Sequence, residues 1–167
     1  DSLQSSPHGR ITGLRTGYGE LDDMLDGLHP AELIIIAARP SMGKTSFALS
    51  IASNLAKRGG GVVFYTMEMT KIQLTQRLIC SEARVSMQAA KQQTLSRDDL
   101  DKLTAAGNKI NQWPLFISQE TSLTPEGLLA SLRTLRRQNP IDLVIVDYLQ
   151  LMAEPTVKES RNQQITA

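Results

Sequence analysis

The chain lacks the features that would place it outside the cell or in a membrane. Its 167 residues include one cysteine, Cys80, which excludes an internal disulfide. Cys80 lies in an apolar stretch of helical spacing, which indicates a buried, inert thiol and fits a reducing cytosol. No apolar run approaches the roughly 20 residues of a membrane span, and residues 1–10 lack the apolar core of a signal peptide. We therefore expect a cytoplasmic protein without membrane contact.

An excess of charge of either sign is also missing. Lysine and arginine number 18 against 17 aspartates and glutamates, so the net charge is +1. This balance excludes the broad basic surface of a dedicated nucleic-acid binder, and any nucleic-acid contact must be local. No cysteine and histidine set has metal-site spacing, so Trp113, His8 and His29 are interpreted as structural residues.

The length predicts one domain with a substantial core, because a chain of this size buries about 70% of its unfolded surface. The polar, serine-rich residues 1–15 are typical of a linker or disordered tail. Residues 16–153 carry the motifs of the predicted core, and 154–167 are interpreted as a loop and the start of a truncated helix. The expectation is a piece of a longer chain.

Short apolar runs rich in β-branched residues alternate with helical patterns. The runs predict strands buried on both faces and lie at 32–38, 62–67, 114–118 and 142–147. Helix starts are marked by Thr70 with Gln73, by Ser96 with Asp99, and by Thr124 before Pro125. The alternation predicts an α/β fold whose mostly parallel sheet has helices on both faces. Ligands of such folds bind at the carboxyl ends of the strands.

The stretch "AARPSMGKTS" at 37–46 is close to the phosphate-binding pattern of glycine, four residues and Gly-Lys-Ser/Thr, with Ala38 in the first glycine position. Backbone N–H groups of such a loop cradle phosphates, the lysine reaches the β and γ oxygens, and the hydroxyl ligates Mg²⁺. Alanine can occupy the first position if its φ stays negative. The alternative is a capped turn with a surface lysine. The predicted nucleotide-binding residues are Ala38, Arg39, Pro40, Ser41, Met42, Gly43, Lys44, Thr45 and Ser46.

Two acids follow predicted strands and should face this loop. Asp147 ends "LVIVD" in the Walker B arrangement, where its carboxylate would serve the Mg²⁺ opposite Thr45. Glu68 follows the strand at 62–67, where a carboxylate could orient or deprotonate the attacking water. An ordinary strand-terminating aspartate and a solvated loop glutamate are the alternatives.

Three arginines, Arg133, Arg136 and Arg137, lie opposite the apolar side of the last predicted helix. They could touch a phosphate backbone or a neighbouring subunit. A solvated helix face is the simpler interpretation.

Three blocks resemble the ATPase domain of DnaB-type replicative DNA helicases. They are "TGYGELDDMLDGLHPAELIIIAARPSMGKTSFA" (16–48), "FYTMEMT" (64–70) and "DLVIVDYLQLM" (142–152). The form with alanine first is similar to that family's own loop. The resemblance implies a RecA-like P-loop NTPase core, here truncated after the Walker B strand. It also implies a six-subunit ring that encircles one DNA strand at a replication fork and moves along it by hydrolysing ATP.

The resemblance also assigns roles to residues. Lys44 and Thr45 would bind phosphate and Mg²⁺, Asp147 would serve the Mg²⁺, and Glu68 would activate water. Primase and a helicase loader are the implied protein partners.

Some of the family's parts lie beyond this sequence. A γ-phosphate sensor and an arginine finger follow later in the family, and fingers contribute about 10³ to 10⁵ in rate. We therefore expect the isolated piece to hydrolyse nucleotide hardly at all. Residues 153–163 could form a first DNA-contacting loop with Lys158 and Arg161, or a plain surface loop.

Two other functions stay open at this point. A RecA-like recombinase or repair ATPase would share the core but form filaments, and the 17–28 and 147–152 stretches favour the helicase. A binding module that uses nucleotide as a switch would need neither Glu68 nor Asp147 for fast hydrolysis.

Overall fold

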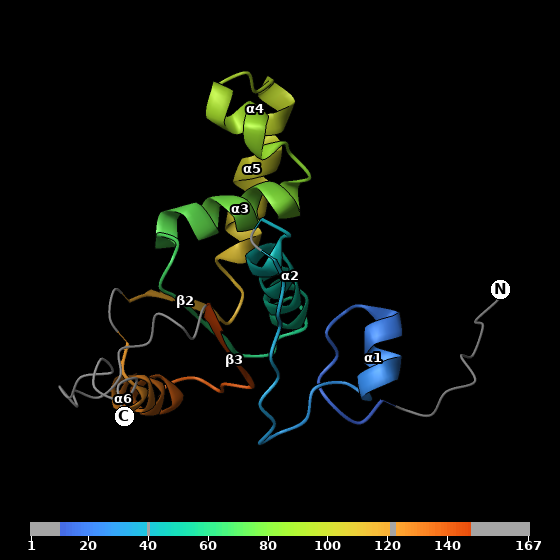
Figure 1. Cartoon of the computed structure of the whole chain (residues 1–167). Helices are drawn as coiled ribbons and strands as arrows, with labels where there is room; N and C mark the ends of the chain where they lie inside the picture. Colours follow the sequence, from blue (N-terminus) through green and yellow to red (C-terminus); the bar gives the residue numbers. More distant parts are fainter. Residues whose placement is uncertain (1–10, 40, 121–122, 148–167) are drawn as a thin grey trace, which may run out of the picture.

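The computed structural model describes residues 11–39, 41–120 and 123–147 (Figure 1). Helices separate the strands of this part of the chain, as predicted, with two helices before the first strand and three between the first and the second. In chain order they are α1 (Gly19–Leu25), α2 (Lys44–Ala56), β1 (Val62–Thr66), α3 (Lys71–Ala83), α4 (Met87–Gln92), α5 (Arg97–Ile110), β2 (Leu115–Gln119), α6 (Pro125–Arg136) and β3 (Leu143–Asp147).

The strands of the described residues form one parallel sheet in the order β2-β1-β3. β1 pairs with β2 from Val62 opposite Leu115 to Thr66 opposite Gln119. On its other side, β1 pairs with β3 from Val62 opposite Leu143 to Thr66 opposite Asp147. All five residues of β1 are buried, because helices cover both faces of this central strand. The predicted parallel α/β arrangement is confirmed.

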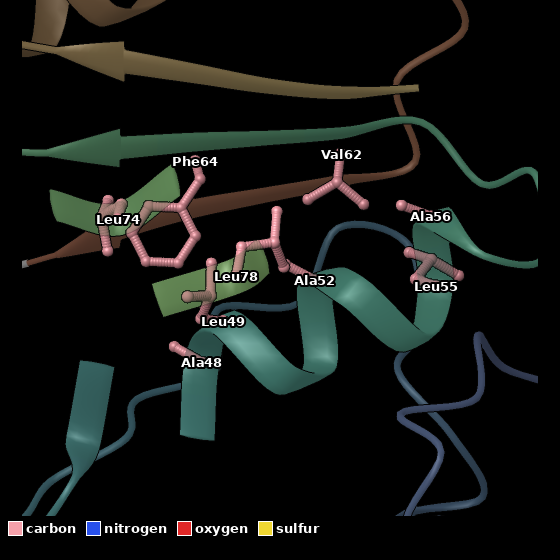
Figure 2. Close-up of a cluster of buried hydrophobic side chains, with 9 residues drawn as sticks. All are labelled: Ala48, Leu49, Ala52, Leu55, Ala56, Val62, Phe64, Leu74 and Leu78. Atoms are coloured by element: carbon pink, nitrogen blue, oxygen red, sulfur yellow. The ribbon is translucent and has the colours of Figure 1, made fainter. Parts of the chain in front are cut away.

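One face of the sheet packs against α2 and α3. Figure 2 shows small and branched side chains of α2 turned toward Val62 and Phe64 of β1, with Leu74 and Leu78 of α3 beside them. Three alanines of α2 are almost fully buried, which lets this helix approach the sheet closely. The α2 members of the cluster are Ala48, Leu49, Ala52, Leu55 and Ala56.

The opposite face packs against α6. Val63 and Tyr65 of β1 form a second cluster with Leu123, against which Leu128, Leu132 and Leu135 pack. The Tyr65 hydroxyl donates a hydrogen bond to Ser131 Oγ at 2.8 Å, which fixes α6 laterally over the strand. Successive residues of β1 therefore serve opposite cores.

The prediction of a strand at 32–38 is wrong. Residues 32–38 belong to no strand of the described sheet and are all exposed. Leu33 is 79% and Ile35 is 71% exposed. The prediction rested on an apolar, β-branched run, which measures local preference, whereas a strand also needs a hydrogen-bonded neighbour. A run of the same apolar, β-branched character forms the strand β1, which has a neighbour on each side.

The segment before the loop is held onto α2. Leu14 forms a bridge with Leu28 and closes a small unit around α1. The buried carboxylate of Asp22 accepts bonds from the Thr16 backbone N–H at 2.7 Å and from its hydroxyl at 2.6 Å. Asn54 of α2 donates to the Thr16 carbonyl at 3.0 Å. Contacts of the core therefore begin a few residues before Thr16, within the segment predicted as linker.

The helices α3, α4 and α5 form a group beyond α2 (Figure 1). The predicted capping boxes at Thr70 and Ser96 are both present, and Thr124 caps α6 with Pro125 in the first turn. Cys80 is buried, as predicted, and burial raises the pKa of its thiol. Within the residues that the structure describes, no helix is long and apolar enough to cross a membrane.

Candidate functional site

The carboxyl ends of β1 and β3 meet at one edge of the sheet. Thr66 and Asp147 are register partners, and the Met67 N–H donates to the Asp147 carbonyl at 2.9 Å. Asp147 is 3% exposed, so its carboxylate lies inside the structure. Polar groups at this edge face the place where open parallel sheets bind ligands.

The loop at 38–46 leads into the N-terminus of α2. Gly43 caps the helix with φ 89°, a left-handed conformation that costs glycine little, and its carbonyl accepts from the Phe47 N–H at 2.9 Å. Ser41 also has a positive φ, 64°. Ala38 is not among the described residues with positive φ, which is the condition for alanine in the first position. Ala38, Arg39 and Met42 are exposed, and Pro40 lies outside the described residues.

Three of the predicted residues come together at this edge. The Thr45 hydroxyl donates to Asp147 Oδ2 at 2.6 Å, although the two residues are 102 positions apart. Lys44 Nζ lies 3.2 Å from Asp147 Oδ1. The first residues of α2 therefore bind one carboxylate through both of its oxygens. The positive end of the α2 dipole faces the same place, which favours an anion there.

The oxygen atoms at this edge fit a magnesium-bound phosphate. A carboxylate and a hydroxyl are the hard ligands that Mg²⁺ takes, usually with phosphate oxygens and waters completing its shell. Among the described residues there is no group of three or more His, Cys, Asp or Glu that could hold a metal alone.

Glu68 lies directly beyond β1, one residue after the Met67 N–H that contacts Asp147. Its side chain is exposed. The adjacent turn is held by Thr66, whose hydroxyl donates to the Met69 carbonyl at 2.9 Å. The structure thus places Glu68 at the same sheet edge as Asp147, and its side chain forms no hydrogen bond or ion pair with the described residues of the loop.

Two contacts of the loop helix were not predicted. Arg77 of α3 donates from Nη1 to Ser46 Oγ at 3.4 Å. Tyr18 contacts Phe47 with ring centroids 5.1 Å apart. Both contacts depend on how separate elements pack, which local sequence spacing does not indicate.

A family model described as the DnaB-like helicase C terminal domain matches residues 13–167. The chain belongs to this family. It is 36% identical to the replicative DNA helicase DnaB of Leifsonia xyli subsp. xyli, over 99% of this chain and 37% of that protein. The Geobacillus stearothermophilus protein of the same name is 37% identical over 95% of this chain and 35% of its own length. The chain therefore spans little more than a third of these relatives.

Solved structures agree with the family at the level of the fold. The ATPase domain of G40P superposes with a TM-score of 0.85 at 33% identity, covering 95% of this chain and 57% of that one. A DnaB-like replicative helicase, described with its interactions with primase, gives 0.84 at 34% identity over 94% of this chain and 38% of its own. The RecA-like core expected from the resemblance is thus supported. Lys158 and Arg161 lie outside the described residues.

Proposed function

We propose that this chain is the nucleotide-binding part of a replicative DNA helicase motor. The full-length protein would hydrolyse ATP with Mg²⁺ and use the energy to move on single-stranded DNA and unwind the duplex at a fork. The observation that carries the proposal is the convergence of Lys44 and Thr45 on Asp147 at 3.2 and 2.6 Å. Membership of the DnaB-like family supports the helicase over the recombinase.

The triphosphate would lie along the loop at 38–46, with backbone N–H groups and the start of α2 facing it. Lys44 would turn from Asp147 to the β and γ oxygens, since its side chain is only partly buried, with 28% of it exposed. A bound Mg²⁺ would neutralise charge on the transferred phosphoryl group. Thr45 and Asp147 are the residues that would hold it.

Glu68 is proposed to orient the attacking water and accept its proton. Glu68 is exposed and lies two residues after Thr66, the last residue of β1. Thr66 is the register partner of Asp147, which ends the neighbouring strand β3. Phosphoryl transfer needs positioning and charge neutralisation more than covalent chemistry, and in this proposal Asp147 serves the metal while Glu68 serves the water.

The proposed function also implies partners for the full-length protein. The full-length protein would form a homo-hexamer around single-stranded DNA. Primase is a proposed partner because one similar structure is described with its interactions with primase. A helicase loader is the further partner that the family resemblance implies.

The two assigned roles separate in a binding and hydrolysis experiment on the full-length protein. Glu68→Gln should keep the affinity for Mg²⁺-ATP and lose turnover, because it removes only the proton acceptor. Lys44→Ala should lose both. Asp101→Asn, an exposed change on α5, is the matched control and should change neither.

Normal turnover in Glu68→Gln would contradict the role of that residue. Tight ATP binding without turnover in the unmodified protein would instead support a nucleotide switch.

A further inference from the structure

The outward side of α6 combines arginines with an exposed leucine. Arg133 and Arg136 follow Leu129 at positions four and seven along the helix, so the three share one side. Leu129 is 54% exposed, and both arginines are exposed. Neither arginine makes an ion pair or hydrogen bond with the described residues. The leucines that pack on the sheet lie on a neighbouring side of α6, about 100° away around its axis. We call Leu129, Arg133 and Arg136 the α6 face.

The outward side of α1 has the complementary composition. One side of this helix carries Glu20 and, three and four residues later, Asp23 and Met24. Met24 is 82% exposed, the highest value among the exposed large hydrophobic residues of the described chain. Glu20 and Asp23 are exposed and have no ion pair or hydrogen bond with the described residues. We call these three residues the α1 face.

The other acids of this helix and its end are already in use. Asp22 is buried against Thr16, and Asp26 accepts bonds from Thr12. Hydrogen bonds from Thr12 lower the pKa of Asp26, so this carboxylate serves the fold. The unpaired charges of α1 are therefore confined to its outward side.

The two faces lie on opposite outer layers of the molecule. The α1 unit is joined to α2 through the Asn54 contact with Thr16, and α2 covers one side of the sheet. Helix α6 covers the other side. The layers therefore run α1, α2, sheet and α6, and α1 and α6 stand apart in Figure 1.

We propose that the α6 face of one copy of this chain docks on the α1 face of the next copy. The contact would pair Arg133 and Arg136 with Glu20 and Asp23 and cover Leu129 with Met24. Because different faces meet, the contact is heterologous and repeats head to tail, which produces a ring or a helical array. The inference rests on the proposed function, since it specifies a contact of the proposed ring.

A second copy fits the α6 face better than nucleic acid does. Phosphates would pair with the arginines but leave Leu129 uncovered, whereas Met24 is an apolar partner of matching exposure. The same chain also carries the acidic complement, which nucleic acid would repel. Complementary charge across the contact sets its register and its sensitivity to salt.

Charge reversal in the full-length protein tests the contact by sedimentation velocity. Arg133→Glu with Arg136→Glu should raise the dissociation constant of the assembly about tenfold or more, and Glu20→Lys with Asp23→Lys should do the same. One chain carrying all four changes restores opposite charges across the contact and should recover assembly. Lys91→Glu on α4 and Asp101→Lys on α5 are the matched controls, since both residues are exposed and unpaired within the described chain.

Several results would overturn the proposal. One is that either double charge-reversal variant assembles at the same protein concentration as the unmodified protein. Another is that the variant carrying all four changes fails to recover assembly. Normal assembly with weakened single-stranded DNA binding in the arginine variants would assign the α6 face to nucleic acid instead. Nucleotide affinity is measured on the same variants, so a failed contact and a failed nucleotide site give different results.

Discussion

Replacing Asp147 by asparagine should change the affinity for nucleotide differently in the absence and in the presence of Mg²⁺. The Asp147 carboxylate holds Lys44 at 3.2 Å and Thr45 at 2.6 Å, so these two groups must leave it before they can reach phosphate and metal. The same negative charge repels an incoming triphosphate. Asparagine keeps the shape and an acceptor for Thr45 while it removes the charge. Metal-free nucleotide should therefore bind more tightly to Asp147→Asn than to the unmodified protein.

The magnitude follows from the ion pair. At an effective dielectric constant of about 20, unit charges at this separation attract by about 5 kcal/mol before solvation is counted. The Lys44 side chain is 28% exposed and Asp147 only 4%, so water screens the lysine side and desolvation offsets part of the attraction. A net effect of about 1–2 kcal/mol remains, which is about tenfold in affinity.

Calorimetric titration of ATP in EDTA and in Mg²⁺ measures both affinities. Asp147→Asn should bind ATP about tenfold more tightly than the unmodified protein in EDTA, and should gain little from Mg²⁺ because it lacks the carboxylate that is proposed to hold the metal. Asp101→Asn on α5 should match the unmodified protein in both buffers. Weaker binding of Asp147→Asn in EDTA would refute the reasoning, because it would mean that Asp147 supports the phosphate site instead of competing with it.

Three further predictions concern stability. Phe64→Ala should cost about 3–5 kcal/mol in urea unfolding because Phe64 is fully buried, and a cost as small as that of exposed Leu129→Ala would contradict the core assignment. Gly61→Ala should lower the melting temperature because its Cβ would overlap the Pro140 carbonyl, whereas Gly107→Ala in α5 meets nothing and should not. Burial raises the pKa of Glu82, but hydrogen bonds and charges of Lys109 and Lys57 outweigh it and lower the pKa below 4.5. The stability that this interaction contributes is present above pH 4.5 and is lost as the pH falls. The free energy of unfolding of Glu82→Gln should therefore depend less on pH in this range than that of the unmodified protein. An equally steep loss of stability in Glu82→Gln would contradict the contribution of the Glu82 contacts with Lys57 and Lys109.

The apolar runs in the sequence predicted all three strands of the described sheet, and the helical patterns predicted the helices between them except α4. The run at 62–67 became the buried centre strand because it has partners on both sides and a core on both faces. The run at 32–38 is also apolar and rich in β-branched residues, but it is exposed and pairs with no strand of the described sheet. Pairing is a property of the tertiary structure, so composition alone could not separate the two. The short helix α4 has no buried residue and left no apolar pattern to read.

The convergence at the site could be predicted from the phosphate-binding pattern itself. That pattern places Lys44 and Thr45 at the start of a helix and an aspartate such as Asp147 at the end of a strand, and the groups meet although no strand precedes the loop in the described residues. The contact of Arg77 with Ser46 needed the relative rotation of α2 and α3, which no local spacing encodes.

Unwinding of a forked DNA duplex by the full-length protein tests the central claim most directly. The unmodified protein should separate the strands only when ATP and Mg²⁺ are present, and Lys44→Ala should separate none while still folding. Strand separation by Lys44→Ala at the unmodified rate would contradict a motor driven through this loop. ATP turnover and DNA binding without strand separation in the unmodified protein would contradict the helicase itself.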